Sequence, residues 1–378
     1  MLLIKTKNAV LQDIKDAIGQ VIGANQSLHS LVLTDEDRQD ILKTLVTYSD
    51  NIPHPAHGMT NINGELISTT LSRWQILAYV ASIDLTIAKW FESHLDALSI
   101  LHEVGYEHPT DGLWAVWAAE GHHNPIRYDQ GRITGAKSWC SGAHLVDYAL
   151  MTYRDEQGDS QLISVAMHQS GITIDTSEWH AVGMQATDTA TVQFDHVAAD
   201  NVGASNDYLD RVGFWHGAAG VAACWYGAAA SLAAYLITAY QQKPGDYKAM
   251  YLGEISTALS VTQHYFYHIA GLIDIESHCH HELAIRELRS QVEQVARLVI
   301  ATVGQALGAA PFCNNAHFAR LSADLTVFIR QSHGAFDLQK IGELSSVLAH
   351  SLTNDENNNL SNNIKTELQG GRGNIWQL

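Results

Sequence analysis

This sequence contains few charged residues and no excess of basic ones. Only 16% of its 378 residues are charged, whereas 46% are hydrophobic. Such a composition supplies a large buried core, and it excludes an intrinsically disordered chain. The formal net charge is −18, so the basic surface that binds nucleic-acid phosphates is not expected. The length allows two or three domains, or one large domain of several layers.

Cysteine is also rare, and its spacing argues against covalent or metal frameworks. The four cysteines lie far apart and form no CxxC pair, so neither a disulfide framework nor a zinc ribbon is expected. The N-terminal segment carries charges throughout and has no long apolar stretch, which argues against a signal peptide. We therefore expect a reducing compartment, the cytoplasm.

Common nucleotide and metal motifs are absent as well. No GxGxxG follows a predicted strand, and neither GxxxxGK[ST] nor HExxH occurs. The run HCHH at residues 278–281 invites a metal interpretation, but adjacent ligands on a helix cannot all turn toward one ion. We interpret this run as a polar loop at the start of a helix and expect no metal site.

One apolar run, residues 217–240, has the length of a membrane span. Its 24 residues carry no formal charge. The run consists mainly of Ala and Gly, however, and no cluster of Lys or Arg adjoins it. A close-packed, buried helix is therefore favoured, and no membrane insertion is expected.

Three segments with different patterns follow one another, and a polar tail ends the chain. Residues 1–110 predict an N-terminal helical domain, and residues 111–205 alternate short β-prone runs with turns, as in a β-barrel or sandwich domain. Residues 206–350 predict a C-terminal four-helix bundle. Residues 351–378 are rich in Asn and Gly. The expected fold class is α+β, with helices and strands segregated along the chain. The long helices are predicted near 213–241, 246–277, 281–308 and 314–332, with a shorter one near 336–349.

Polar residues also occur inside the N-terminal helical pattern. Asp84, His94, Asp96 and His102 fall within the apolar, helically spaced stretch 71–104. We expect most of them to be solvated or to cap helices.

The most informative stretch is ITGAKSWCSGAHLVDY, residues 133–148. Its first half predicts a strand, with Gly135 as a kink or a point of close approach. Because alternate side chains share one face of a strand, Trp139 and Ser141 should lie together. That face would offer an aromatic wall and a hydrogen-bond donor to a planar ligand. An ordinary sheet core is the alternative interpretation.

Together with the order of helices and strands, this stretch resembles the acyl-CoA dehydrogenase superfamily of flavoproteins. GAKSWCSGAHLVDY is similar to the family's G-x-K-x-W-[IV]-[ST] motif and the aspartate-bearing strand after it. GMQATDT at 183–189 is similar to G-M-R-x-[ST]-x-T, and VQFDHV at 192–197 resembles the strand that returns to the bundle. The resemblance spans about residues 71–342 and implies a helical domain, a β-domain and a four-helix bundle.

The resemblance implies a bound flavin, FAD or alternatively FMN. In the family, the residues that match Trp139 and Ser141 lie beside the flavin ring and its N5 edge. A donor there stabilises the charge that develops when flavin accepts a hydride. WAAE at 117–120 resembles the strand that ends in [ST]-E-P, which adds Trp117 and Ala119 to the implied cofactor contacts. Here Ala119 replaces the hydroxyl residue, and the loop that follows is shortened.

A second implied cofactor contact comes from the bundle. QALGA at 305–309 is similar to Q-x-x-G-G, which touches the adenine half of the cofactor from a neighbouring subunit. Gln305, Gly308 and Ala309 are therefore implied cofactor contacts, and the chain is expected to form a homodimer or homotetramer.

The catalytic Glu of the dehydrogenases has no counterpart in this sequence. At about its place stand Ser332 and His333, followed by Asp337. A His there resembles the flavin-dependent monooxygenase branch, and an imidazole can move protons near neutral pH. His333 and Asp337 are the candidate catalytic residues. A helix cap or a bundle contact, made by this pair one turn apart, is the alternative.

Three functions follow from these observations. The resemblance implies a dehydrogenase acting on a CH–CH group of a small-molecule substrate such as an acyl-CoA, with an electron-transfer flavoprotein as partner. The missing Glu favours a two-component monooxygenase that receives reduced flavin from a reductase. The shortened loop, and the missing Arg that often supports the pyrophosphate, favour a non-catalytic homologue of the same fold.

Overall fold

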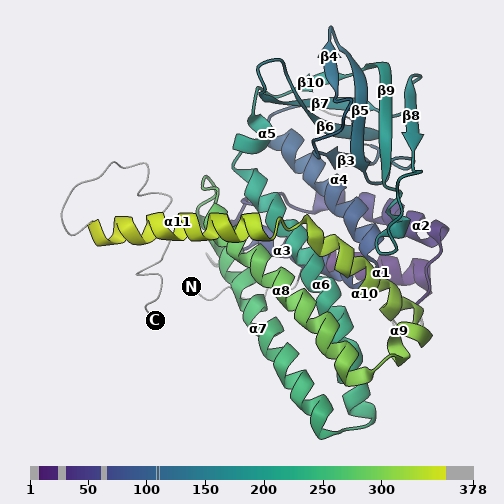
Figure 1. The fold of residues 1–378 in the computed structure, drawn as a ribbon, viewed down its shortest axis with the longest axis vertical. Helices are drawn as coiled ribbons and strands as arrows, with labels where there is room; N and C mark the ends of the chain where they lie inside the picture. The colour runs from purple at the N-terminus through teal and green to yellow at the C-terminus, as the bar shows by residue number, and fades with distance from the viewer. Residues whose placement is uncertain (1–7, 24–30, 61–65, 108, 110, 355–378) are drawn as a thin grey trace.

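The computed structural model describes residues 8–23, 31–60, 66–107, 109 and 111–354 (Figure 1). Most of the predicted polar tail, from residue 355 on, lies outside them. Helices come first, strands second and long helices last, which confirms the predicted α+β class. The strands of the two large sheets lie between residues 114 and 202, but the division of the chain into domains stays a prediction.

Four helices and a short hairpin make up the N-terminal part. They are α1 (Ala9–Ile22), α2 (Asp35–Val46), β1 (Met59–Thr60), β2 (Leu66–Ile67), α3 (Thr69–Ile83) and α4 (Leu85–Glu103).

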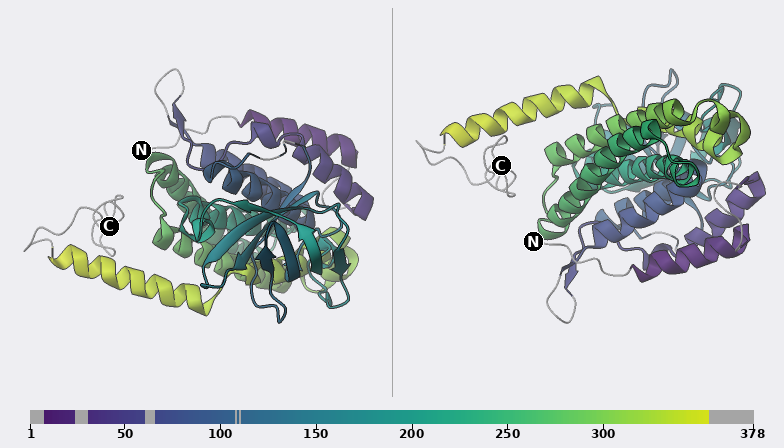
Figure 2. Two further views of the ribbon diagram at one scale, coloured as in Figure 1. Left: turned by 90° about the horizontal axis from the view of Figure 1, so that it is seen from above. Right: turned by 90° about the horizontal axis from the view of Figure 1, so that it is seen from below.

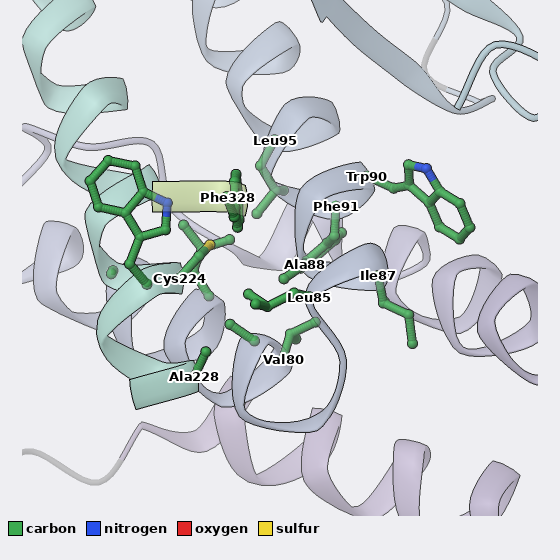
Figure 3. Packing of buried hydrophobic residues seen from close by; sticks show 14 of the residues in the cluster. Val80, Leu85, Ile87, Ala88, Trp90, Phe91, Leu95, Cys224, Ala228 and Phe328 are labelled. Carbon is green, nitrogen blue, oxygen red and sulfur yellow. The ribbon is translucent and has the colours of Figure 1, made fainter. Parts of the chain in front are cut away.

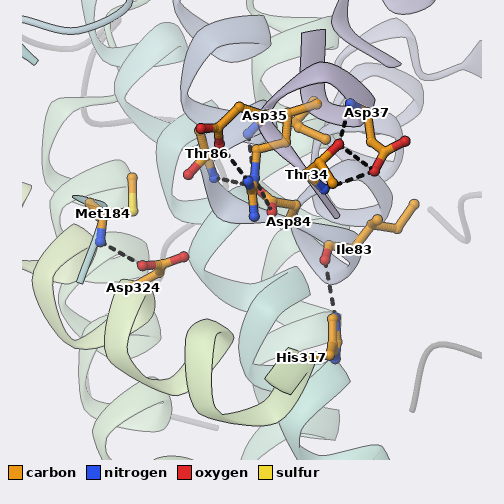
Figure 4. Close-up of polar contacts among 11 residues, drawn as sticks. Thr34, Asp35, Asp37, Ile83, Asp84, Thr86, Met184, His317 and Asp324 are labelled. Carbon is orange, nitrogen blue, oxygen red and sulfur yellow. Dashed lines mark hydrogen bonds and ion pairs between the residues drawn. The ribbon is translucent and has the colours of Figure 1, made fainter. Parts of the chain in front are cut away.

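The long helical pattern breaks between α3 and α4 at Asp84. One carboxylate oxygen of Asp84 accepts the backbone N–H groups of Thr86 and Ile87 and so caps α4. The other oxygen forms a 2.8 Å ion pair with the buried Arg38 of α2 (Figure 4). Asp84 is thus a cap, as predicted. His94, in contrast, is 2% exposed and accepts the backbone N–H of Trp114, so it is neither solvated nor a helix cap.

Two four-stranded sheets form the middle part. The first sheet has the order β10-β7-β6-β3 and the second the order β4-β5-β9-β8. Only β3 and β6 pair in parallel within these sheets. The three-residue strands β4 and β10 were not predicted, because they are too short to show an alternating pattern. The strands are β3 (Trp114–Trp117), β4 (Arg127–Asp129), β5 (Arg132–Cys140), β6 (Tyr148–Arg154), β7 (Ser160–Ala166), β8 (Ile172–Asp175), β9 (Ala190–Ala198) and β10 (Asp200–Val202).

Long helices follow and pack against α3 and α4 (Figures 1 and 2). They agree with the predicted bounds to within a few residues, except that α10 ends earlier and continues as a 3-10 turn. The last helix, α11, projects away from the body (Figure 2). The elements are α5 (Asp207–Asp210), α6 (Gly213–Gln242), α7 (Asp246–Ile275), α8 (Glu282–Leu307), α9 (Ala310–Asn314), α10 (Ala316–Phe328), η4 (Ile329–Gln331) and α11 (Ala335–Asn354).

Helix α6 is the central helix of the bundle. Among the described helices it is the one long and apolar enough to cross a membrane, yet 72% of its most apolar window is buried inside the protein. Its small residues allow α3 to approach closely, since a Cβ at Gly227 would lie 2.0 Å from the carbonyl oxygen of Ala78. In Figure 3, Leu85 and Phe91 of α4 point toward Cys224 of α6 and Phe328 of α10.

Candidate functional site

Strand β5 ends in a bulge that turns Trp139 outward. The pairing of β5 with β9 shifts register between Lys137 and Cys140, and Trp139 adopts a left-handed φ of 62°. A bulge breaks the alternation of side chains, and Ser141 lies in the turn beyond β5. The prediction that Trp139 and Ser141 share one strand face was therefore wrong. Trp139 is 65% exposed and meets Trp179 edge to face, with 6.0 Å between the ring centroids.

Ser141 begins a chain of three hydroxyl groups. Its Oγ lies 2.9 Å from Oγ1 of Thr189, which lies 2.8 Å from Oγ1 of Thr187. Thr187 in turn donates its hydroxyl proton to the carbonyl oxygen of Met184 at 2.7 Å. The buried Trp117 donates its indole N–H to the carbonyl oxygen of Ser141 at 3.1 Å. The two predicted residues Trp117 and Ser141 are thus brought together, although through a backbone atom.

A buried lysine of β5 binds strand β6 and the segment that follows β3. Lys137 donates to the carbonyl oxygen and the hydroxyl of Thr152, and its Nζ lies 3.6 Å from the carboxylate of Glu120. Burial lowers the pKa of Lys137, and the neighbouring Glu120 opposes that shift. Ala119 lies on the surface beside this cluster. Lys137 therefore has protein partners and acts here as a structural cation.

The segment that carries Thr187 and Thr189 is docked onto α10. A Cβ at Gly183 would lie 2.1 Å from the carbonyl oxygen of Ala323, so only glycine fits at this contact. The backbone N–H of Met184 donates to the carboxylate of Asp324 (Figure 4). The other carboxylate oxygen of Asp324 has no hydrogen-bond partner. The position of the hydroxyl chain therefore depends on a buried acid of the bundle.

The Asp324 carboxyl gives this contact a pH dependence. Burial raises its pKa to about 6, from an ordinary 3.8, although the Met184 N–H opposes the shift. Between these values the folded state binds more protons than the unfolded one, so stability falls as the pH rises from about 4 to about 6. Asp324→Asn should remove this decline and raise the free energy of unfolding by about 2 kcal/mol at pH 8.

Urea unfolding of both proteins at pH 5 and pH 8 measures this effect. Asp84→Asn is the matched control, since it weakens the ion pair with Arg38 and should destabilise the protein at both pH values. An Asp324→Asn variant that loses stability at pH 8 would contradict the expected sign.

His333 and Asp337 lie in the linker after η4 and at the start of α11. Asp337 is buried and forms an ion pair with Arg286 of α8, and it accepts the backbone N–H of His333 at 3.1 Å. The Arg286 guanidinium also lies 4.2 Å from the ring centroid of Trp215. The His333 side chain is exposed. The two residues are close, but the imidazole and the carboxylate are not a bonded pair, and their catalytic roles stay predictions.

A second arginine fixes the position of this linker. Arg289 of α8 donates to the carbonyl oxygens of Ala218 in α6 and Gln331 in η4. Burial lowers its pKa to about 10, which leaves it cationic at neutral pH. Arg286 and Arg289 thus tie α6, η4 and α11 to one face of α8.

The remaining predicted cofactor contacts lie elsewhere. Gln305, Gly308 and Ala309 are exposed at the C-terminal end of α8. Figure 1 places this end far from the sheets that carry Trp139. A single chain does not bring the two groups together, so their predicted contact would have to come from a neighbouring subunit.

A cavity of about 410 Å³, with several charged groups in its wall, lies between α3, α4, α6 and the loop before β1. No motif in the sequence predicted this cavity. Asp96, which was expected to be solvated or to cap a helix, is one of its lining residues. The signal was the spacing of Glu92, Asp96, Ser99 and Glu103, which puts four polar residues on one face of α4. The charged lining residues are Arg73, Glu92, Asp96, Glu103 and Arg211, and the imidazoles are those of His54, His57, His102 and His216.

Burial shifts the pKa values of several cavity groups. It raises the pKa of Glu92, and the nearby Lys89 opposes the shift. It lowers the pKa of Arg73 to about 10 and that of His216 to about 4. His216 is therefore neutral at pH 7. Arg211 pairs with Glu103 at 3.0 Å. The cavity therefore offers charged groups to a polar ligand, with apolar surface between them.

The corner formed by Trp139 and Trp179 fits a planar ring system. Trp139 is largely exposed and meets the half-buried Trp179 at a right angle, and the half-buried Ser141 follows Trp139 by two residues in the chain. Aromatic faces of this kind stack on flat ligands, and a hydroxyl fixes their orientation. An aromatic pair beside a hydroxyl is compatible with the ring of a flavin, the cofactor that the sequence resemblance implies.

No protein-family model and no curated protein matches this chain, but its fold matches solved structures along nearly the whole length. Butyryl-CoA dehydrogenase from Megasphaera elsdenii superposes with a TM-score of 0.72 and 14% identity, covering 91% of this chain and 99% of that one. FMN-bound TdsC from Paenibacillus sp. A11-2, a dibenzothiophene monooxygenase, superposes with a TM-score of 0.68 and 14% identity, covering 89% of this chain and 96% of that one. KijD3, in complex with FMN and a dTDP-linked amino sugar, superposes with a TM-score of 0.71 and 16% identity, covering 91% of this chain and 95% of that one. The chain therefore has the acyl-CoA dehydrogenase fold.

Proposed function

We propose that this chain is a flavin-dependent oxidoreductase that binds its flavin in the reduced form, as a two-component monooxygenase served by a flavin reductase does. The observation that carries the proposal is the direction of the hydroxyl chain that begins at Ser141. This direction decides whether Ser141 offers a proton or a lone pair to a ligand.

Each hydroxyl group has a single proton to donate. Thr187 gives its proton to the carbonyl oxygen of Met184, so the bond between Thr187 and Thr189 must be donated by Thr189. The bond between Thr189 and Ser141 must then be donated by Ser141. Ser141 is therefore left with acceptor lone pairs only. It suits the N5–H group of a reduced flavin and not the unprotonated N5 of an oxidised one.

The other residues have separate tasks in this proposal. When bound, reduced flavin supplies the electrons for dioxygen chemistry. Trp139 and Trp179 would offer aromatic surface to the flavin ring. His333 would exchange a proton with the bound cofactor or substrate, because its imidazole is exposed and is not occupied by Asp337, which binds Arg286.

The proposed cofactor and substrate classes rest on separate observations. FMN is supported by the two structures that contain it, TdsC and KijD3, and FAD remains the alternative. The cavity between α3, α4 and α6 offers guanidinium groups, carboxylates and a neutral imidazole. We propose that a small polar molecule is the substrate, bound through these groups.

A second candidate is a dehydrogenase acting on a CH–CH group of an acyl thioester. It is favoured by Glu92, a buried carboxyl in the cavity whose pKa is raised, because a carboxylate of raised pKa is a stronger base. In that case an acyl-CoA should bleach bound oxidised flavin without oxygen. The monooxygenase should instead consume oxygen only when a reductase supplies reduced flavin.

The assembly and location are part of the proposal. Gln305, Gly308 and Ala309 lie far from Trp139 within one chain, which supports a homodimer or homotetramer with a shared flavin site. We also propose a cytoplasmic location, where flavin reductases and reduced flavin are available.

The test compares the binding of oxidised and of anaerobically reduced FMN by titration calorimetry. The wild-type protein should bind the reduced form more tightly. Ser141→Ala should lower this preference by up to about tenfold, the value of one neutral hydrogen bond. Thr187→Val should also lower the preference, because Thr189 is then free to donate to Ser141 and Ser141 can offer its proton to oxidised flavin.

Two variants serve as controls in the same titration. Trp139→Ala should weaken the binding of both flavin forms. Tyr247→Ala, which removes an 80% exposed ring on α7, should change the binding of neither form. Tighter binding of the oxidised form would contradict the proposal and favour the dehydrogenase. Failure to bind either form would favour a non-catalytic protein of this fold.

A further inference from the structure

We infer that the turn between α7 and α8 binds a transition-metal ion of the zinc class through Glu276, Cys279 and His281. The ligand atoms of these three side chains all lie within 4.8 Å of one another. A tetrahedral zinc ion with bonds of about 2.0 to 2.3 Å holds its ligands roughly 3.5 Å apart. Rotation of the side chains by about an ångström would therefore close the site.

The backbone of the turn explains how these residues converge. The N–H of Cys279 donates to the carbonyl oxygen of Glu276 at 2.9 Å and closes the turn. His281 adopts a left-handed φ of 52° just before α8 begins. Adjacent ligands on one helix, as the run 278–281 would supply, cannot all turn toward one ion. Glu276, Cys279 and His281 are instead spaced at i, i+3 and i+5 in a turn, and their ligand atoms converge.

The contacts around His281 resemble the outer partners of a metal ligand. Its Nε2 lies 3.1 Å from the carbonyl oxygen of Glu276, and a backbone carbonyl on one ring nitrogen orients the other nitrogen for a metal. The ring of His216 on α6 stacks on His281 at 6.1 Å and bonds to the carbonyl oxygen of Cys279 at 3.1 Å. An ion would thus join the ends of α7 and α8 beside α6.

The chemistry of the ligand set selects the class of ion. A thiolate and an imidazole favour zinc, cobalt or nickel over magnesium or calcium, which prefer oxygen ligands alone. Three protein ligands leave a fourth position for water. Ser277 of the same turn lines the 410 Å³ cavity, so this fourth position would lie close to the cavity wall.

The test uses the untagged full chain, freed of metal by a chelator and titrated with Co²⁺. We expect one Co²⁺ for each chain, with the near-ultraviolet charge-transfer band of a cobalt–thiolate bond, and displacement by Zn²⁺. Cys279→Ser should lose this band. Cys313→Ser, which changes an exposed cysteine of α9, should keep it.

A third variant keeps the test independent of folding. Asn tolerates left-handed backbone better than other residues that could replace His281, so His281→Asn should fold normally and lower the Co²⁺ affinity at least tenfold. Circular dichroism verifies the fold of each variant. The inference is overturned by the absence of Co²⁺ binding, by a band that persists in Cys279→Ser, or by equal loss of the band in Cys313→Ser. None of these outcomes depends on flavin.

Discussion

Replacing Asp337 by Ala should lower the free energy of unfolding by about 3 kcal/mol, because it removes the main counter-charge of a buried guanidinium. Arg286 is 7% exposed and Asp337 is 4% exposed. Glu282 forms an ion pair with Arg286 at 2.8 Å and should keep this ion pair in the variant. The loss of stability should therefore lie near the lower end of the range for breaking a buried ion pair. Urea unfolding followed by circular dichroism measures the change.

The neighbouring His333→Ala variant separates stability from catalysis. Its side chain is exposed, so its stability should change by no more than about 0.5 kcal/mol, while turnover with reduced flavin should fall about 100-fold if it moves the proton. Unchanged turnover would remove His333 from the mechanism. The double variant Arg286→Met, Asp337→Leu should regain most of the stability lost in Asp337→Ala, since an apolar pair can replace a buried ion pair.

Replacing Gly227 by Ala should destabilise the protein by about 3 kcal/mol or more, because the added methyl group overlaps the backbone of α3. A Cβ at Gly227 would lie 2.0 Å from the carbonyl oxygen of Ala78 and 2.6 Å from its carbonyl carbon. Relief requires α3 and α6 to move apart, which would loosen the cavity between them. The thermal midpoint and the urea midpoint should both fall.

The matched control is Gly253→Ala on α7. This glycine also lies inside a long helix, but no atom would meet its Cβ within 4 Å. Alanine has the higher helix propensity, so this variant should gain about 0.5 to 1 kcal/mol. Opposite signs for the two variants would establish the close approach of α3 and α6. A loss at both positions would indicate a general intolerance of larger residues in the bundle.

Much of the fold could be predicted because its helices are long and its strands carry alternating patterns. Helix α6 was predicted at 213–241 and found at Gly213–Gln242. The break at Asp84 was harder to locate, since the apolar pattern continues through it and only the capping contacts end one helix and begin the next. Local sequence therefore predicts the elements, whereas side-chain contacts decide where some of them end.

The candidate site was less accessible to prediction. The exposure of Trp139 depends on a bulge between β5 and β9, which no spacing within β5 reveals. The direction of the hydroxyl chain depends on Thr187 and Thr189, two residues about 50 positions from Ser141. The cavity combines Arg73, Glu92 and Arg211 from three separate segments. Only the polar face of α4 was visible in the sequence, and its meaning required the packing of α6 against it.

The chain passes back and forth between the two sheets, and this order has a consequence for synthesis on the ribosome. The chain enters the first sheet with β3, leaves for β4 and β5, returns for β6 and β7, leaves again for β8 and β9, and returns with β10. Neither sheet can close until β9 has emerged, about 60 residues after β5. The apolar faces of α3 and α4 also stay uncovered, because α6 is synthesised after the strands of both sheets. The nascent chain therefore exposes much of its core surface until late in translation, when chaperones would have most to bind.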